Sequence, residues 1–440
     1  MLKKIDLKRG SIAQTTFREA EYPAPFAHTL EYSAASRGPW NIAHTGMLIP
    51  EAHEIFVCAQ GCLRGVVLTA AEMGKQDRFS SIFVQEDSVL NGNMEDLIID
   101  GVTDILSKLH YTPRAVLLYT SCIHHFINCD LTYVYSTLRK KFPAIDFIDC
   151  YMTPTMRKSG LTPDELIAKQ MYALWHKREL KQKHINLIAN NIQTDKECEL
   201  YDLAQNGGFL LREIHDCQSY DEYQEMAAAS LNIVFRRAAL PGAEYLKQTY
   251  GQKYLYLPCS YNYTEMLDTL HVFADYLGVE LPDCSHYQAL TSEKLGELKT
   301  LIADTPIMVD YTFSAQYLSL ARLLLENGFN VVRVYTDSFN EDNEQDFYFI
   351  KENFPTVEIN ATVNFKMRFV PRENAEKVLA IGQKAAYFNN TPYFVNTVEN
   401  SGFYGFSGIL KMLDLIMEAY REPKDTEKLV QMKAWGCELI

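Results

Sequence analysis

The sequence lacks the motifs that identify many nucleotide-using and zinc-dependent enzymes. It contains no G-x-x-x-x-G-K-[ST] segment, so we expect no nucleotide hydrolysis by a P-loop. No G-x-G-x-x-G follows a predicted strand, and Gly402, Gly405 and Gly408 have the wrong spacing, which argues against a nicotinamide cofactor. No H-E-x-x-H motif and no pair of C-x-x-C motifs is present, so the standard zinc patterns are absent.

Other scarce features exclude further classes of protein. No run approaches eighteen consecutive apolar residues, so we expect no membrane span. The first ten residues carry charge without an apolar core after them, so we expect no secretory signal and a cytoplasmic location. The chain has 42 Lys and Arg against 56 Asp and Glu, and its formal charge of −14 argues against nucleic-acid binding.

The ten cysteines are spread singly along the chain and do not form a disulfide framework. In a protein without an export signal they should be reduced, which leaves some of them free to bind metal. Six of them show no recognisable spacing and are interpreted as structural: Cys150, Cys198, Cys217, Cys259, Cys284 and Cys437.

Strand-like and helix-like segments alternate through most of the chain, which predicts an α/β fold with mainly parallel sheets. At 440 residues, the chain is long enough for two or three domains. The helix that opens at Leu161 is expected to continue to Lys181 and to join two domains. We predict an irregular segment at residues 1–45, α/β domains at 46–160, 161–300 and 301–407, and a helical segment at 408–440.

The stretch from residue 53 to residue 65 organises the rest of the chain. His53–Cys58 is typical of a short buried strand, and after a tight turn a helix begins at Cys62. A cysteine in the first turn of a helix lies among unpaired backbone N–H groups, which favour the thiolate that binds metals or attacks electrophiles. The alternative is a small apolar side chain packed under a turn.

A second strand, Ala115–Thr120, ends in the same arrangement. Ser121 is a good N-cap, and Cys122 begins a helix that we expect to run to about Lys141. The loops after neighbouring parallel strands meet at the carboxyl edge of a sheet. We therefore expect Cys62 and Cys122 to lie within reach of one cofactor.

Other side chains near this edge leave several assignments open. Cys58 could join Cys62 and Cys122 in a zinc site, although a structural zinc ion requires four ligands. His124 and His125 could be ligands or proton donors, or two half-exposed polar residues at a helix start.

Both cysteine turns are similar to those of a known family. Gln60-Gly61-Cys62, followed by a helix that contains an arginine, resembles the central cluster-binding turn of nitrogenase component 1 subunits. Thr120-Ser121-Cys122, with the following Ile127-Asn128-Cys129-Asp130, resembles their later cysteine turn. The similarity continues through three further segments, at residues 184–208, 306–335 and 400–406.

The family includes nitrogenase, the dark-operative protochlorophyllide and chlorophyllide reductases, and the reductive cyclase of nickel-tetrapyrrole synthesis. The resemblance implies three Rossmann-like domains in a dimer or a higher assembly.

The chain also departs from the family pattern. A first cluster cysteine of the family would fall near Arg37-Gly38-Pro39, where this chain has none. Cys58 or an oxygen ligand could take its place. The regions that match the cysteine and histidine ligands of the nitrogenase metal cofactor lie near Phe235 and Asn396, neither of which can ligate that cofactor. We therefore do not expect dinitrogen reduction.

What the resemblance implies is an electron-transfer reductase. Cys62 and Cys122 from two subunits would hold one [4Fe–4S] cluster at the interface of a homodimer or of a heteromer with a paralogous subunit. A separate ATP-hydrolysing iron–sulfur reductase would supply low-potential electrons. Cys129 is a poor further ligand, because seven helical residues would place it about 10 Å along the axis from Cys122.

The substrate is not specified by the sequence. The resemblance allows a further tetrapyrrole or metal cofactor in a cavity lined by residues such as Arg64, His124 and Tyr261. Two other functions remain open. One is a non-catalytic scaffold for iron–sulfur or metallocofactor assembly, and the other is a metal-free small-molecule binding protein.

Overall fold

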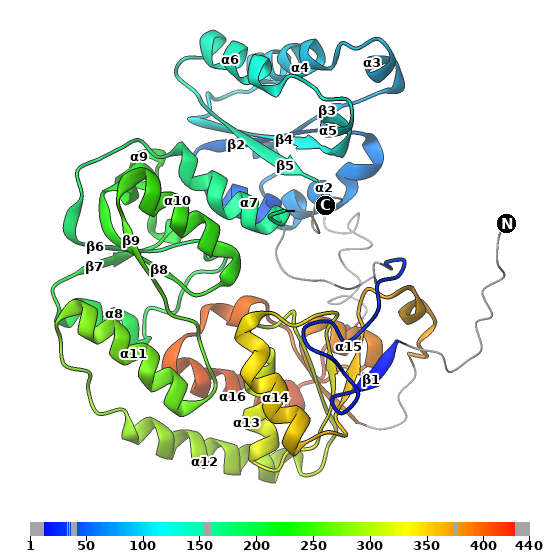
Figure 1. The fold of residues 1–440 in the computed structure, drawn as a ribbon, viewed down its shortest axis with the longest axis vertical. Coiled ribbons are helices and arrows are strands. Elements are labelled where there is room, and N and C mark those ends of the chain that lie inside the picture. The colour runs from blue at the N-terminus through cyan, green and yellow to red at the C-terminus, as the bar shows by residue number, and fades with distance from the viewer. Residues whose placement is uncertain are drawn as a thin grey trace. The chain divides into compact units, whose positions relative to one another are not determined.

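The computed structural model describes residues 13–32, 34, 36, 42–153, 160–372 and 377–426, and these residues form two compact units (Figure 1). The cysteine unit contains the described residues from 42 to 193 and from 204 to 257. The C-terminal unit contains those before residue 37, residues 194–203, and those from 258 onward.

The first sheet of the cysteine unit is fully parallel, with the strand order β3-β2-β4-β5. Its strands are β2 (Ala52–Cys58), β3 (Phe79–Phe83), β4 (Ala115–Ser121) and β5 (Asp146–Met152). Its helices are α1 (Ile42–Met47), α2 (Gln60–Glu72), α3 (Glu86–Leu90), α4 (Met94–Lys108), α5 (Cys122–Phe126) and α6 (Leu131–Lys141). Helices α4 and α6 cover one face and α2 the other (Figure 1). This covering buries β2 and β4 along their whole length, as expected for central strands of a parallel sheet.

The second sheet of this unit is also parallel and has the order β7-β6-β8-β9. Its strands are β6 (Lys181–Leu187), β7 (Leu210–Arg212), β8 (Ala229–Val234) and β9 (Lys253–Tyr256). Its helices include α7 (Pro163–Gln170), α9 (Tyr220–Glu225) and α10 (Leu240–Tyr250).

The expected continuous helix from Leu161 to Lys181 is wrong. Helix α7 ends at Gln170, a 3₁₀ turn covers Met171–Leu174, and Lys181 already belongs to β6. Tertiary contacts end the helix, because the Trp175 side chain is buried in the core and the His176 N–H donates to the Gln224 side chain at 2.8 Å.

The C-terminal unit contains a third sheet with the order β1-β12-β11-β10-β13-β14. Its strands are β1 (Gln14–Thr16), β10 (Ile307–Asp310), β11 (Val331–Tyr335), β12 (Glu358–Asn360), β13 (Leu379–Ile381) and β14 (Phe394–Val395). Helix α8 (Glu199–Asn206) begins in this unit, which also holds α11 (Tyr263–Leu277), α12 (Ser285–Ile302), α13 (Tyr317–Glu326), α14 (Glu344–Asn353), α15 (Gln383–Asn389) and α16 (Gly405–Arg421). Strand β1 pairs antiparallel with β12, and the other pairings are parallel. The N-terminal segment thus contributes an edge strand. Its three residues are too few for a pattern of apolar residues to predict it.

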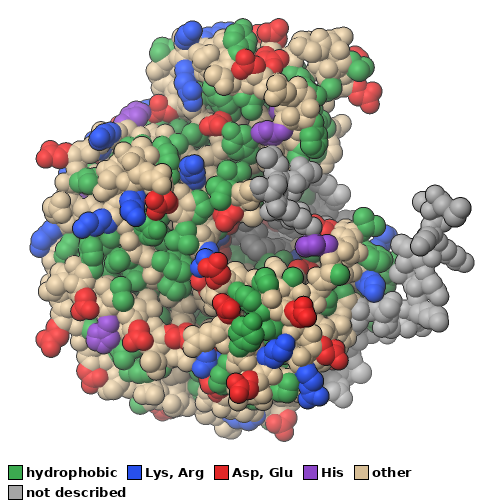
Figure 2. All heavy atoms as spheres, in the orientation of Figure 1, with side chains coloured by type: hydrophobic (Ala, Val, Ile, Leu, Met, Phe, Trp, Pro, Cys, Tyr) green, Lys and Arg blue, Asp and Glu red, His purple; other side chains and the backbone are tan. Residues whose placement is uncertain are grey.

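Among the described residues, every helix is too short or too polar to cross a lipid bilayer. Acidic and basic side chains are mixed over the surface shown in Figure 2.

Two ionisable side chains are buried in β2, the strand that leads to Cys62. His53 contacts the Tyr111 hydroxyl at 2.7 Å and the Ser80 hydroxyl at 2.8 Å, and burial lowers its pKa to about 4. Glu54 accepts a 3.4 Å hydrogen bond from the Tyr119 hydroxyl, while its Oε2 has no partner among the described residues. Burial raises the Glu54 pKa well above its ordinary value. Both side chains therefore favour the neutral form in the interior.

We predict that Glu54→Gln stabilises the protein increasingly as the pH rises above about 4.3, the ordinary pKa of glutamate. Below that pH both the folded and the unfolded wild type hold the proton. Above it the unfolded chain releases the proton and the folded chain keeps it, so the wild type loses up to about 1.4 kcal/mol per pH unit. Urea unfolding at pH 5 and pH 8 measures the difference, with the exposed Glu179→Gln as the control. The prediction would be contradicted if the free energies of unfolding of Glu54→Gln and wild type changed equally with pH.

Candidate functional site

Cys62 and Cys122 follow neighbouring strands at the carboxyl edge of the first sheet. Strands β2 and β4 pair in parallel with Val57 opposite Thr120, so the helices after them begin at the same edge. Cys62 is the third residue of α2, and its N–H donates to the Ala59 carbonyl at 2.9 Å. Cys122 is the first residue of α5. The parallel pairing places both cysteines where the sequence predicts them, one after each strand.

The two thiols differ in exposure but are both accessible. The Cys62 side chain is exposed. Cys122 is half-buried, and its Sγ lies 4.0 Å from the Met152 carbonyl oxygen at the end of β5. Neither forms a disulfide bond. Both sulfurs therefore remain in the thiol form, which is the form that can ionise and bind a metal.

Cys58 occupies a different environment from these two. It is the last residue of β2, its side chain is fully buried, and it belongs to the hydrophobic core beside Phe56 and Leu63. Burial, together with the nearby Cys62, raises the pKa of the Cys58 thiol to about 12. Its role as a ligand stays a prediction, and the cost of forming a thiolate in the core argues for a structural role.

The single helix expected from Cys122 to Lys141 is wrong. Helix α5 ends at Phe126, Asn128 has a left-handed backbone with φ of 52°, and Asp130 caps α6 by accepting the Tyr133 N–H at 2.9 Å. Asn and Asp favour these conformations over a helix interior, because their short polar side chains bond to the local backbone.

Cys129 therefore lies in the linker between α5 and α6, and a distance along one helix axis does not describe its position. Its thiol bonds to the Glu95 carboxylate, and burial together with this carboxylate raises its pKa to about 12. Glu95 also accepts the Asp130 N–H at 2.6 Å. These contacts give Cys129 a structural role in holding the linker against α4.

His124 is not the half-exposed residue that the sequence allowed. It is buried with 1% exposure, and its Nδ1 accepts the Ser121 N–H at 3.1 Å. Burial lowers the His124 pKa, so the neutral ring serves as a backbone cap of α5. His125 is exposed, and its ring centroid lies 5.5 Å from that of Tyr151.

Within the described residues, no three His, Cys, Asp or Glu side chains gather closely enough to hold a metal ion. The first sheet instead offers two accessible thiols at one edge, which is half of the usual four-thiolate set of a [4Fe–4S] cluster. This donor set fits a cluster that is shared with a second polypeptide. Arg37-Gly38-Pro39, where the family pattern has an earlier cysteine, and Cys437 lie outside the described residues.

The C-terminal unit contains a strained turn that was not among the predicted features. Four consecutive residues, Glu399 to Gly402, have left-handed backbones, with φ between 48° and 75°. Asn400 holds the turn, because its Oδ1 accepts the Tyr261 hydroxyl and its Nδ2 donates to the Phe403 carbonyl at 2.7 Å. Such strain is often found at functional sites. The Asn-Ser-Gly sequence was the available signal, since Asn and Gly tolerate positive φ.

The positions that depart from the family pattern have ordinary polar or apolar roles here. Asn396 follows β14, and its side-chain oxygen accepts a hydrogen bond from Gln383 at 2.8 Å. Phe235 follows β8. Tyr261 is buried against Asn400, and the Arg64 side chain lies outside what the structure describes.

We predict that a thiol-alkylating reagent modifies Cys62 well before Cys58 or Cys129 in the folded, metal-free protein. Cys62 is exposed, whereas a pKa of about 12 leaves on the order of one thiol in ten thousand ionised at pH 8. Iodoacetamide labelling at pH 8, read by peptide mass spectrometry over time, measures the order. Labelling in urea controls for the intrinsic reactivity of each peptide. Equal rates for Cys58 and Cys62 in the folded protein would show that Cys58 is accessible.

The fold is similar to solved nitrogenase structures. The structure titled "Nitrogenase Cp1 at pH 6.5" matches with a TM-score of 0.67 and 14% identity, covering 90% of this chain and 94% of that chain. The structure titled "Nitrogenase Cp1 at pH 5" matches with a TM-score of 0.58 and 15% identity, covering 93% of each chain. These matches confirm the predicted α/β fold with parallel sheets.

Sequence comparison gives a family but no individual relative. No curated protein sequence matches the chain significantly. The family model described as "Nitrogenase component 1 type Oxidoreductase" matches residues 43–420, which is most of the chain. The protein therefore belongs to the nitrogenase component 1 type oxidoreductase family.

Proposed function

We propose that this protein is the substrate-reducing component of a nitrogenase-like system. It receives low-potential electrons from a separate ATP-hydrolysing iron–sulfur reductase and passes them, through a [4Fe–4S] cluster at a subunit interface, to a substrate other than dinitrogen. Membership of an oxidoreductase family whose proteins bind iron–sulfur clusters supports the redox role. The observation that carries the proposal is the pair of accessible cysteines, Cys62 and Cys122, after two adjacent parallel strands.

The chain's own residues would hold the cluster in a defined way. Cys62 and Cys122 would each provide one thiolate from rigid strand-to-helix turns, and the same two residues of a second subunit would complete the set. A cluster bound there would supply one-electron transfer. Strands β2 and β4 fix the spacing of the two turns, because their backbones pair along the whole of β2 up to Val57. Such rigidity keeps the ligand positions the same in both redox states.

The surroundings of the two cysteines support a shared interface. Five large apolar side chains are exposed at the end of β3 and on the segments that follow β2, β3 and β4: Val67, Phe83, Leu90, Phe126 and Ile127. Leu90 is 81% exposed and Phe126 is 75% exposed. Exposed apolar groups collected at one edge are typical of a protein-binding surface, and burying them would also exclude water from the cluster.

The electron donor has to be a separate protein in this proposal. The printed sequence contains no P-loop, so ATP hydrolysis would occur on the partner. The partner would need to approach the same carboxyl edge, since the cysteines lie there. The partner would therefore dock, and the electrons would enter, at the same carboxyl edge of the first sheet.

The residues near the matching cofactor positions support a substrate other than dinitrogen. Asn396 bonds to Gln383, and Phe235 has no donor atom, so neither replaces a thiolate or imidazole ligand. The same observation favours the second candidate, a non-catalytic scaffold that carries a cluster for another enzyme. Turnover with an added ATP-dependent reductase separates the two functions, because a scaffold would bind iron without oxidising its electron donor.

We predict that Cys62→Ser and Cys122→Ser each abolish the cluster, while Cys129→Ser and Cys259→Ser keep most of the iron. Serine preserves size but removes the soft thiolate that selects iron–sulfur clusters. Cys58→Ser should also keep the iron, because its side chain is buried in the core. Iron and sulfide content and visible absorption after anaerobic purification measure the outcome. Wild-type iron in Cys62→Ser would remove the basis of the proposed site, and lost iron in Cys58→Ser would make Cys58 a third ligand.

We predict that the anaerobic protein is an oligomer and that the double substitution Leu90→Asp/Phe126→Asp dissociates it and lowers its iron content together. An aspartate at each exposed position should make burial in the interface unfavourable, because its charge would lose water. The core of the subunit should be unaffected, because both side chains lie on its surface. Light scattering coupled to gel filtration, with iron analysis of each peak, measures both effects. Leu290→Asp, at an exposed leucine of the C-terminal unit, is the control. A wild-type monomer with a full cluster would contradict the shared site.

A further inference from the structure

A row of buried amide side chains crosses the second sheet of the cysteine unit. Asn186 on β6 lies opposite Asn232 on β8, so their side chains point to the same face of the sheet. The Asn186 Nδ2 donates to the Asn232 Oδ1 at 3.1 Å, and the Asn232 Nδ2 donates to the Gln252 Oε1 at 2.8 Å. The Gln252 Nε2 then donates to the Ala227 carbonyl at 2.8 Å. All three amide side chains are completely buried, and each donates in the direction away from Asn186.

The row is incomplete at the end nearest the edge strand β7. The Asn186 Nδ2 has two acceptors, because it also donates to the Met226 carbonyl at 2.9 Å. The Asn186 Oδ1 is the acceptor end of the row, and it is buried without a partner among the described residues. Buried polar groups in proteins are nearly always hydrogen-bonded, so an unfilled acceptor indicates a site for a water, an ion or a ligand.

The neighbour of this acceptor on β7 is an arginine whose guanidinium has an unfilled edge. Arg212 lies opposite Asn186 in the parallel register, so the two side chains point to the same face. The Nε and Nη2 of Arg212 are buried and have no hydrogen-bond partner in the described part of the chain. These two atoms form one edge of the guanidinium, and such an edge binds two oxygens of a carboxylate or phosphate.

Two other arginines show what fills this edge elsewhere in the protein. Arg333 directs its Nε and Nη2 to one oxygen of the Glu358 carboxylate, at 2.7 and 2.5 Å. Arg78 donates from the same two atoms to two backbone carbonyls, at 2.8 and 2.5 Å. Arg212 differs from both, because no oxygen of a described residue bonds to its buried edge.

His184 adds another unpartnered atom on this face. It precedes Asn186 by two residues on β6, so both side chains point to one face, and its Nδ1 is buried without a partner among the residues that the structure describes. Burial and the nearby Arg212 lower the pKa of His184, so its ring is neutral near pH 7. A neutral ring can donate from Nδ1 or accept there.

The carboxylates between residues 213 and 225 do not fill this site. Each has another partner: His215 for Glu213, the Glu213 N–H for Asp216, Arg114 for Asp221, the Gln218 N–H for Glu222, and Arg178 for Glu225. None of them bonds to the Nε or Nη2 of Arg212. The missing oxygens therefore have to come from another molecule.

We propose that Arg212, Asn186 and His184 bind a small oxyanion that also carries a hydroxyl group. Two oxygens of the anion would accept the Nε–H and Nη2–H of Arg212, and the hydroxyl would donate to the Asn186 Oδ1. The His184 Nδ1 would donate to a further oxygen. Hydrogen phosphate and 2-hydroxy carboxylates share this chemistry. A simple carboxylate would fill the arginine edge but would leave the Asn186 oxygen unpaired.

The site is open to small solutes and is separate from the candidate cluster site. Arg212 and His184 are each half-buried, and β7 is the outermost strand of the second sheet, so an anion can enter without parting the strands. Cys62 and Cys122 follow strands of the first sheet. Anion binding at Arg212 therefore requires no cluster, and a failure of either site leaves the other untouched.

The test compares four sodium salts on the full-length protein at pH 7 and constant ionic strength: phosphate, glycolate, acetate and chloride. Isothermal titration calorimetry measures the affinities, and hydrogen exchange read by mass spectrometry locates the binding. We expect phosphate or glycolate to bind at least tenfold more tightly than acetate and chloride, and to slow exchange at residues 181–187 and 210–217. Tighter binding of phosphate would indicate a phosphorylated ligand, and tighter binding of glycolate a hydroxy acid.

Two results with the wild-type protein would overturn the proposal. Acetate binding as tightly as the better of phosphate and glycolate would show that no hydroxyl is recognised. No protection of these strands by any of the salts at 10 mM would leave water as the partner of Arg212. Both results are read without a variant, so they do not depend on the folding of an altered chain.

A pair of variants tests the arginine edge itself. Arg212→Lys keeps the positive charge but removes the two-atom edge, so it should weaken binding of the preferred anion at least tenfold. Lys253→Gln removes an exposed positive charge from the other edge strand of the same sheet and should leave the affinity unchanged. Circular dichroism and thermal unfolding check that both variants fold. Wild-type affinity in folded Arg212→Lys would refute the site.

Discussion

The parallel hydrogen bonding of β2 to β4 is the constraint on which the candidate site depends. It aligns Val57 with Thr120 over two completely buried strands, so that the turns after them begin at the same level. The strands are held by packing on both faces, including the Phe56 and Tyr119 rings, whose centroids lie 4.1 Å apart. A shift of β2 by one residue would reverse which side chains face the core, and Cys62 would no longer follow the strand at this position.

Burial then divides the cysteines into two classes. Cys58 ends the strand inside the core, where forming a thiolate is costly, while Cys62 lies four residues later on the surface. Cys129 is held by Glu95 in the linker that follows α5. Among the described residues at this edge, Cys62 and Cys122 are therefore the two candidate ligands, and this incomplete set is the physical reason that the proposed cluster needs a second polypeptide.

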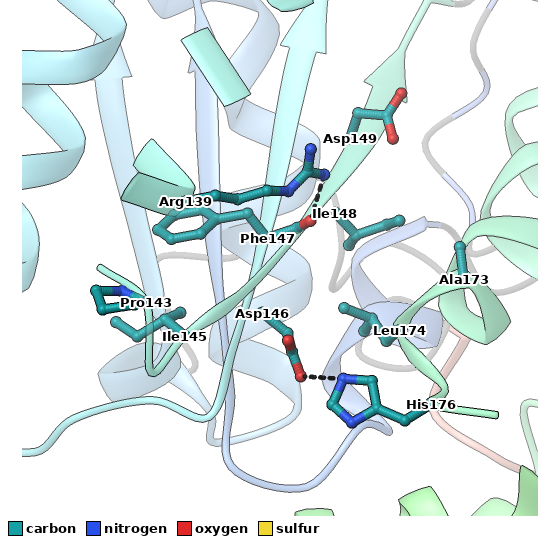
Figure 3. A pocket seen from close by; sticks show the side chains of 10 residues that line it. All are labelled: Arg139, Pro143, Ile145, Asp146, Phe147, Ile148, Asp149, Ala173, Leu174 and His176. Atoms are coloured by element: carbon teal, nitrogen blue, oxygen red, sulfur yellow. Dashed lines mark hydrogen bonds and ion pairs between the residues drawn. The ribbon is translucent and has the colours of Figure 1, made fainter. Parts of the chain in front are cut away.

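The two ends of the first sheet offer different kinds of surface. The carboxyl edge carries thiols and exposed apolar side chains such as Leu90 and Phe126, which suits a dry protein interface. The start of β5 lines a pocket of mixed polar character, in which Arg139 and His176 lie beside Asp146 and Asp149 (Figure 3).

The sequence alone determined the α/β class, the strands that lead to Cys62 and Cys122, and the family, because buried strands and helix starts depend on local patterns of apolar residues and caps. It could not show that the helix after Cys122 ends at Phe126, or that the helix after Leu161 ends at Gln170. Asn128 and Asp130 favour the first break locally, and contacts with Glu95 and Gln224, from distant parts of the chain, hold the chain in the observed paths. Burial of Cys58 and His124, the pairing of β1 with β12 and the pocket beside β5 were likewise decided by the tertiary structure. The local sequence specifies which helix or strand forms. The exposure of a side chain and the residues that it contacts are set by the packing of the whole chain, and they decide which thiol can ionise and bind a metal.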